Sequence, residues 1–238
     1  MSRLILFAAV ALVWHGLAPV SAQSYPQRAV RFILPFGPGA GVDITARMLA
    51  EPLAARWGKP VVVENRPGGD GIVAINTFTS ANDDHTLLFV PTSTFTAHPY
   101  TQDKLPYDPE RDLAPIAMVA KNSLLFLVNP KVPANSLAQF VAFAKANPGK
   151  LNYASPGAAT QTHLVIELFS RKADIKLQHI PYRGGAPAMT AMVADETQFT
   201  AISTLLSLPQ IQTGALRAIG TGSLSRDAQL PDLPTVAE

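Results

Sequence analysis

The sequence has 238 residues, a formal charge of +2 and no cysteine, which excludes disulfides, thiolate metal sites and a cysteine nucleophile. Its 19 Lys and Arg nearly balance its 17 Asp and Glu, which argues against a nucleic-acid-binding protein, since such a protein carries a basic face. Apolar residues make up 47% of the chain, enough at this length to bury one large core or two small ones.

The chain opens with the pattern of a secretory signal peptide. Arg3 supplies a positive charge, residues 4–17 are mostly apolar, and residues 20–22 (Val-Ser-Ala) form a small-residue cleavage site. We predict cleavage after Ala22. The apolar stretch is too short to span the ~30 Å core of a bilayer, so we expect a soluble mature protein.

Beyond residue 22, short apolar strands alternate with helices, a pattern typical of α/β architecture with largely parallel sheets. A connection rich in proline and aspartate, residues 101–115, divides the alternation into a lobe 1 (residues 23–105) and a lobe 2 (residues 106–222). Pro52 lies within the first helix and is predicted to kink it. The expected elements are strand 30–34, helix 43–57, strands 60–63, 86–90 and 124–128, a helix opened by a capping box at 136–139, strand 152–155, helix 160–169, strand 178–182, helix 186–193, and strands 198–202 and 215–221.

Two Gly- and Pro-rich turns each connect a strand to a helix, one in each lobe. Residues 36–41 read Phe-Gly-Pro-Gly-Ala-Gly, and residues 155–159 read Ser-Pro-Gly-Ala-Ala. Backbone N–H groups at a helix N-terminus lack intrahelical partners, and the helix dipole favours negative charge there. Two such turns facing each other across a cleft could hold a carboxylate; the alternative for each is an ordinary tight turn.

Other kinds of site find less support. Gly37 and Gly39 follow a strand, and Glu64 ends the next one, but Val42 occupies the third glycine position of the dinucleotide fingerprint. We therefore expect no cofactor.

Metal binding and catalysis are also not expected. The histidines after residue 22 show no i, i+4 pair with acids at ligand spacing, so a metal site is not predicted. His163, one turn into its helix, could orient the second turn or contact a ligand, and the alternative is a packed helix residue. No Gly-x-Ser-x-Gly elbow is present. An enzyme is not expected, and an exported hydrolase is only a remote alternative.

Five segments, in this order, resemble the tripartite tricarboxylate transporter substrate-binding family, the TctC or Bug type. They are residues 35–43, 63–68, 153–157 with His163 and Leu164, 181–188, and 233–238. The resemblance implies a type II-like two-lobed periplasmic binding protein, in which each lobe is a mostly parallel sheet flanked by helices. It implies a monomer in the periplasm that captures a small carboxylate-containing ligand for integral membrane permease subunits. A ligand-sensing receptor on the same fold is the alternative.

The resemblance also implies that the two turns grip the ligand carboxylate through backbone N–H groups and bound water. Other side chains would then read the far end of the ligand. The residues expected to contact the ligand are Phe36, Gly37, Gly39, Ala40, Gly41, Asp43, Thr92, Ser155, Gly157, Ala158, Ala159, Thr160, His163, Tyr182, Gly184 and Ser203.

Members of this family continue beyond the position of Glu238 and return to complete the first lobe. We therefore expect residues 223–238 to begin that return, lobe 1 to be incomplete at its C-terminal side, and an inactive truncated fragment to be a further alternative.

Overall fold

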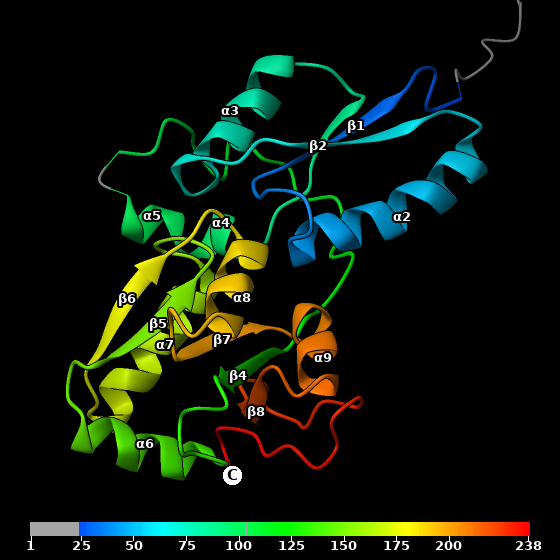
Figure 1. Ribbon diagram of the computed structural model, residues 1–238. Coiled ribbons are helices and arrows are strands. Elements are labelled where there is room, and N and C mark those ends of the chain that lie inside the picture. The colour runs from blue at the N-terminus through cyan, green and yellow to red at the C-terminus, as the bar shows by residue number, and fades with distance from the viewer. Residues whose placement is uncertain (1–23, 103) are drawn as a thin grey trace, which may run out of the picture.

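Figure 1 shows the chain folded into two α/β lobes joined by an extended connection. The computed structural model describes residues 24–102 and 104–238. The signal peptide predicted at residues 1–22 lies outside the described residues. The elements are β1 (Val30–Leu34), α2 (Gly41–Trp57), β2 (Val61–Asn65), η1 (Gly69–Gly71), α3 (Ile72–Ala81), β3 (Thr86–Leu88), α4 (Ser93–Thr96), α5 (His98–Thr101), β4 (Leu124–Val128), α6 (Leu137–Ala146), β5 (Leu151–Ser155), α7 (Gln161–Ala173), β6 (Leu177–Pro181), α8 (Gly185–Val193), β7 (Phe199–Ser203), α9 (Thr204–Gln212) and β8 (Arg217–Thr221).

Lobe 1 is built on a parallel three-stranded sheet of order β2-β1-β3. Side chains alternate between the two faces along a strand. Val30, Phe32 and Leu34 of β1 therefore point to the same face, where they pack with Ala46 of α2. Helix α3 covers the other face (Figure 1), and its Ile75 is buried together with Tyr107 and Leu113. Packing around α3 therefore includes Tyr107 and Leu113 of the connection between the lobes.

Helix α2 leads away from the first strand and runs for 17 residues. Pro52 lies inside it without ending it, although proline lacks the N–H that would bond to the preceding turn. The helix ends at Gly58, which adopts a left-handed conformation with φ 63° and donates its N–H to Ala54.

Lobe 2 is a five-stranded sheet of order β6-β5-β7-β4-β8. Strand β5 is parallel to β6 and β7, whereas β4 is antiparallel to both β7 and β8, so four of the five strands run in one direction. Along β4, Phe126 faces a cluster with Phe140 of α6 and Ile166 of α7, and Leu125 faces a cluster with Met189 of α8. Helices therefore cover both faces.

The segment after β8, residues 223–238, packs against lobe 2. Leu230 and Leu233 contact the cluster that contains Met192, and Thr235 forms an isolated parallel bridge with Thr221. Leu230 and Leu233 of this segment are thus held by the second lobe, and the return to lobe 1 stays a prediction.

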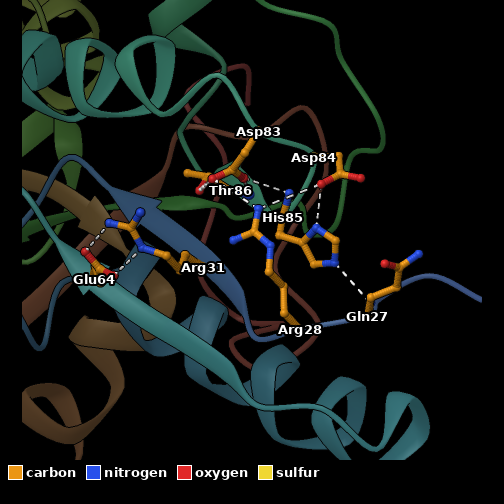
Figure 2. A network of polar contacts seen from close by, with 8 residues as sticks. All are labelled: Gln27, Arg28, Arg31, Glu64, Asp83, Asp84, His85 and Thr86. Carbon is orange, nitrogen blue, oxygen red and sulfur yellow. Dashed lines mark hydrogen bonds and ion pairs between the residues drawn. The ribbon is translucent and has the colours of Figure 1, made fainter.

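A polar network ties the beginning of the described chain to lobe 1 (Figure 2). The Gln27 N–H donates to His85 Nε2 at 3.0 Å, and His85 Nδ1 lies 2.5 Å from Asp84. Arg31 bonds to Glu64 at 2.6 Å, and this bond, together with a smaller contribution from Arg66, lowers the pKa of Glu64 to about 2 against the opposing effect of burial. Glu64, the acid near the end of the next strand after the Gly37 and Gly39 turn, is thus held in an ion pair.

Within residues 24–102 and 104–238, no helix is long and apolar enough to cross a membrane. The same residues contain no group of three or more His, Asp or Glu side chains placed to hold a metal ion.

Candidate functional site

Four helices begin at the carboxyl ends of strands where the two lobes meet. The first turn, residues 36–41, joins β1 to α2, and the second turn, residues 155–160, joins β5 to α7. Helices α8 and α9 follow β6 and β7, and Figure 1 places α8 and α9 below the start of α2. In open α/β sheets the carboxyl ends of the strands are where ligands bind.

Asp43 supports the first turn from inside. Its side chain is 3% exposed, and it accepts hydrogen bonds from the Gly39 N–H at 2.9 Å, from Arg47 and from Asn65. Burial alone raises the pKa of Asp43, but the bonds from Arg47, Gly39 and Asn65 outweigh it and hold this pKa below its ordinary value. The Asp43 carboxylate is thus engaged with its own lobe, and it shapes the turn.

The start of α2 keeps backbone donors for a ligand. Its N-cap, Ala40, makes no side-chain capping bond, and the Ala40 N–H itself bonds to Gly37 at 3.3 Å. The next three N–H groups belong to the first helical turn and have no intrahelical acceptor. They are those of Gly41, Val42 and Asp43. This end of α2 therefore combines free donors with the positive end of the helix dipole.

The first turn faces lobe 2 at very short range. A methyl group placed on Gly39 would lie 3.7 Å from Ala186 Cβ, and one placed on Gly41 would lie 3.0 Å from Ser203 Oγ. A methyl group on Gly184 would lie 3.9 Å from the Gly37 nitrogen. Contacts across the lobes thus join the first turn to the β6–α8 turn and to the end of β7.

Ser203 stands out among the residues that the first turn meets. It is 6% exposed, it precedes α9 without a side-chain capping bond, and its Oγ has no hydrogen-bond partner within the described part of the chain. Buried hydroxyl groups in folded proteins are nearly always bonded. The Ser203 hydroxyl and the first N–H groups of α2 are therefore the polar groups at this boundary that we consider as candidate ligand contacts.

The second turn is tied together by its own side chains. Thr160 Oγ1 donates to the Gly157 carbonyl at 2.8 Å and accepts from the His163 N–H at 3.4 Å, which caps α7. Ala159 has a positive φ of 56° and donates its N–H to His163 Nδ1 at 3.1 Å. The Ala159 N–H is therefore used within the turn. The first backbone N–H groups of α7, which have no acceptor within the helix, are those of Gln161 and Thr162.

Asp70 of lobe 1 reaches the second turn. A methyl group placed on Gly157 would lie 2.9 Å from Asp70 Oδ1 and 3.9 Å from the Tyr182 carbonyl. Asp70 was not among the residues predicted from the sequence, where the only signal was its position between Gly69 and Gly71. In the structure it adopts a positive φ of 51°. The second turn thus meets an acid of the other lobe, and the first turn meets Ser203.

Comparison with known proteins identifies the family. A family model described as the tripartite tricarboxylate transporter family receptor matches residues 45–238. The chain belongs to this receptor family.

Relatives of this receptor span the whole chain. It is 35% identical to BugT of Bordetella pertussis over 241 residues, which cover 100% of this chain and 74% of BugT. The R. palustris protein Rpa4515, solved with adipate, is 26% identical at a TM-score of 0.87. MatC from Rhodopseudomonas palustris, solved with bound malate, is 27% identical at a TM-score of 0.84. These two matches cover 90% of this chain and 72% and 73% of the solved chains.

These comparisons confirm the two-lobed α/β fold of periplasmic binding proteins and the role of solute-binding receptor. Family and fold are those of solute-binding proteins rather than of enzymes.

The remaining predicted ligand residues of the receptor occupy varied positions. The Phe36 carbonyl accepts from Asn65 at 2.8 Å, and Thr92 precedes the short helix α4. Gly184 donates its N–H to the Pro156 carbonyl at 3.1 Å, which joins the β6–α8 turn to the second turn. The Tyr182 hydroxyl lies 3.5 Å from Glu196, so this hydroxyl is directed toward lobe 2, to which Tyr182 itself belongs.

A hollow of about 590 Å³ lies elsewhere on the receptor, between β8, the end of α9 and the C-terminal segment. Its lining includes Leu216, Arg217 and Leu233, and none of the predicted ligand residues. Since the free helix donors and the unpartnered hydroxyl lie between the lobes, we place the candidate site there and not in this hollow.

Proposed function

We propose that this receptor binds a small carboxylate-containing solute between its lobes in the periplasm and delivers it to integral membrane permease subunits. One observation carries the proposal: the Oγ of Ser203, which has no hydrogen-bond partner among residues 24–102 and 104–238, lies against Gly41, at the N-terminus of α2, across the boundary between the lobes. The carboxylates bound by Rpa4515 and MatC, adipate and malate, support the same ligand class.

The chemistry of the site favours an anion with two acceptor oxygens. Backbone N–H groups at a helix N-terminus donate to a carboxylate without requiring a charged side chain. The donors of α2 come from lobe 1 and Ser203 comes from lobe 2. A carboxylate that bonds to both would hold the lobes together, which is how a binding protein couples capture to closure.

Location and partners follow from the family and from the N-terminal pattern. Export with cleavage after Ala22, a monomeric state and delivery to permease subunits stay predictions. A sensing receptor on the same fold would bind the same ligands, so binding data do not separate the two roles. Genes for membrane permeases beside the gene for this chain would favour transport.

Carboxylates are expected to stabilise the purified receptor against heat. A ligand that binds only the native state adds about 2.7 kcal/mol at a concentration of 100 Kd, which corresponds to a rise in Tm of roughly 5–10 °C for a chain of this size. The measurement is a thermal-shift panel of mono-, di- and tricarboxylates and amino acids, with the matching neutral amides as controls. A folded protein whose Tm no carboxylate changes would contradict the proposal.

Replacing Ser203 by alanine is expected to weaken carboxylate binding about tenfold, since one hydrogen bond to a charged group contributes roughly 1.5 kcal/mol. Ser170→Ala is the matched control, because Ser170 Oγ is also buried without a partner in the described chain but lies late in α7, away from the turns. Calorimetric titration of both variants measures the difference. Equal affinities for the two variants would mean that Ser203 is an unsatisfied core hydroxyl and no ligand donor.

A further inference from the structure

Two histidines from different elements stack beneath the second turn. His163 belongs to α7 and His179 to β6, and their ring centroids lie 4.2 Å apart at an interplanar angle of 20°. Tyr153 of β5 stacks with His179 at 4.8 Å, and its hydroxyl donates to Glu167 of α7 at 2.6 Å. The stack therefore joins β5 and α7, the two elements that the second turn connects, to β6.

Each histidine also bonds to one end of the second turn. His163 Nδ1 accepts the Ala159 N–H at 3.1 Å. His179 Nε2 lies 2.6 Å from Ser155 Oγ, and this hydroxyl in turn bonds to the carbonyl of Gly157 at 2.8 Å and to its N–H at 3.2 Å. Through these bonds the histidine pair holds the turn from Ser155 to Ala159.

The bond from the Ala159 N–H to His163 Nδ1 requires a neutral His163 ring. The Ser155 hydroxyl donates to the Gly157 carbonyl and therefore accepts from His179 Nε2–H, a bond that a charged ring also makes. A ring nitrogen accepts a hydrogen bond only while it carries no proton, so a proton on His163 Nδ1 would turn two donors toward each other. Two charged rings stacked at 4.2 Å would also repel. Protonation of the pair therefore releases Ala159, whose positive φ of 56° is an uncommon conformation for a residue with a side chain.

We propose that His163 and His179 are positioning residues that hold the second turn in its ligand-receiving conformation while both rings are neutral, so that carboxylate affinity falls in acid. This inference rests on the proposed function, because it assumes that the second turn receives the ligand. It adds a device to that function: the receptor captures its ligand at neutral pH and loses it at low pH.

The charged surroundings set the direction of the pH effect. Burial and, to a smaller extent, His163 lower the pKa of His179 to about 4, against the opposing effect of Glu167 of α7. From β5 the pair meets Tyr153, and from lobe 1 Asp70 lies against the turn at Gly157. Because the folded protein resists a proton on His179, the neutral His179 ring contributes stability that is complete above the ordinary histidine pKa of about 6.5 and is lost as the pH falls toward about 4.

The test compares variants that keep or remove the bonding atom without titrating. In His163→Asn the amide oxygen replaces Nδ1, and in His179→Gln the amide replaces Nε2, so the double variant keeps both bonds without an imidazole. His163→Ala and His179→Ala remove them. His85→Asn is the control, because His85 lies before β3 at the opposite end of the lobe 1 strands.

Affinities for malate and adipate are measured by calorimetry from about pH 7.5 to about pH 4, a range that reaches the lowered pKa of His179. Wild type and His85→Asn are expected to lose about tenfold more affinity over this range than the double variant. The ligand itself titrates equally in every experiment, so the difference between the variants reports on the histidines. At pH 7.5 the double variant should bind within about threefold of wild type, and the alanine variants about tenfold more weakly. Ring nitrogen NMR of the wild type should show His163 Nδ1 unprotonated at neutral pH.

The outcomes separate the two proposals. If malate or adipate binds and the double variant shows the same pH profile as wild type, or the alanine variants bind normally, the positioning role is wrong and the proposed function stands. If the folded protein binds no carboxylate, the proposed function fails and this inference fails with it. Circular dichroism at each pH confirms that the variants compared are folded.

Discussion

Replacing Gly157 by valine is expected to abolish carboxylate binding, with a loss of affinity of at least about a hundredfold. Gly157 adopts φ 149°, a conformation that side chains rarely allow, and even a methyl group would lie 2.9 Å from Asp70 Oδ1 of the other lobe. A branched side chain would keep the lobes apart and displace the second turn from α7. Calorimetric titration with malate and adipate measures the effect.

Gly149→Val is the matched control. Gly149 also has a positive φ, 71°, but no atom lies within 4 Å of the position that a Cβ would take. The Gly149→Val variant therefore has a strained backbone but no new contact across the lobes, and we expect it to lose about 1–2 kcal/mol in stability. Gly157→Ala, a milder change, keeps the test valid if valine prevents folding. Normal binding by a folded Gly157→Ala or Gly157→Val protein would remove the second turn from the site.

Replacing Phe199 by alanine is expected to lower the free energy of unfolding by about 4 kcal/mol. Phe199 of β7 is completely buried, and its ring lies 4.2 Å from Phe140, 5.8 Å from Phe126 and 6.0 Å from Phe169. Removing the ring leaves a cavity at the centre of the aromatic cluster that joins α6 and α7 to the sheet, and it also removes aromatic contacts. Urea unfolding followed by circular dichroism measures the change.

Leu168→Ala serves as the comparison for Phe199. Leu168 also lies in lobe 2, on α7, but its side chain is 58% exposed, so its truncation should cost less than about 0.5 kcal/mol. A loss below about 1 kcal/mol for Phe199→Ala would show that the cluster repacks around the cavity, and would contradict its central place in the core of lobe 2.

Most of the strands and several helices could be predicted because each carries a local signal. The apolar run 124–128 is β4 as expected, and Ser136 caps α6 by accepting the Gln139 N–H at 3.2 Å. Helices α3 and α9 were not predicted. Helix α9 contains Pro209 and follows directly on a buried strand, so its helical form depends on packing against β4, β7 and β8 and not on a local pattern.

The candidate site was predicted in part. The two Gly- and Pro-rich turns, Ser203 and His163 stand in the sequence with their chemistry visible, since a strand, small residues and a helix start occur in order. His179 and Asp70 were missed as members of the site. Neither lies near the turns in sequence, and only strand pairing brings His179 beside Tyr153 and only the meeting of the lobes brings Asp70 to Gly157.

The sequence by itself determined the α/β class, the receptor family and the two turns at which helices begin, because these depend on local periodicity and on short motifs read in order. The tertiary structure alone decided which groups the turns meet. It places the Ser203 hydroxyl, which lacks a hydrogen-bond partner in the described part of the chain, against α2. It turns the Asp43 carboxylate inward to support the first turn, and it stacks His163 on His179. Such contacts join residues far apart in the chain, and strand order and packing between the lobes set their distances, which no local pattern encodes.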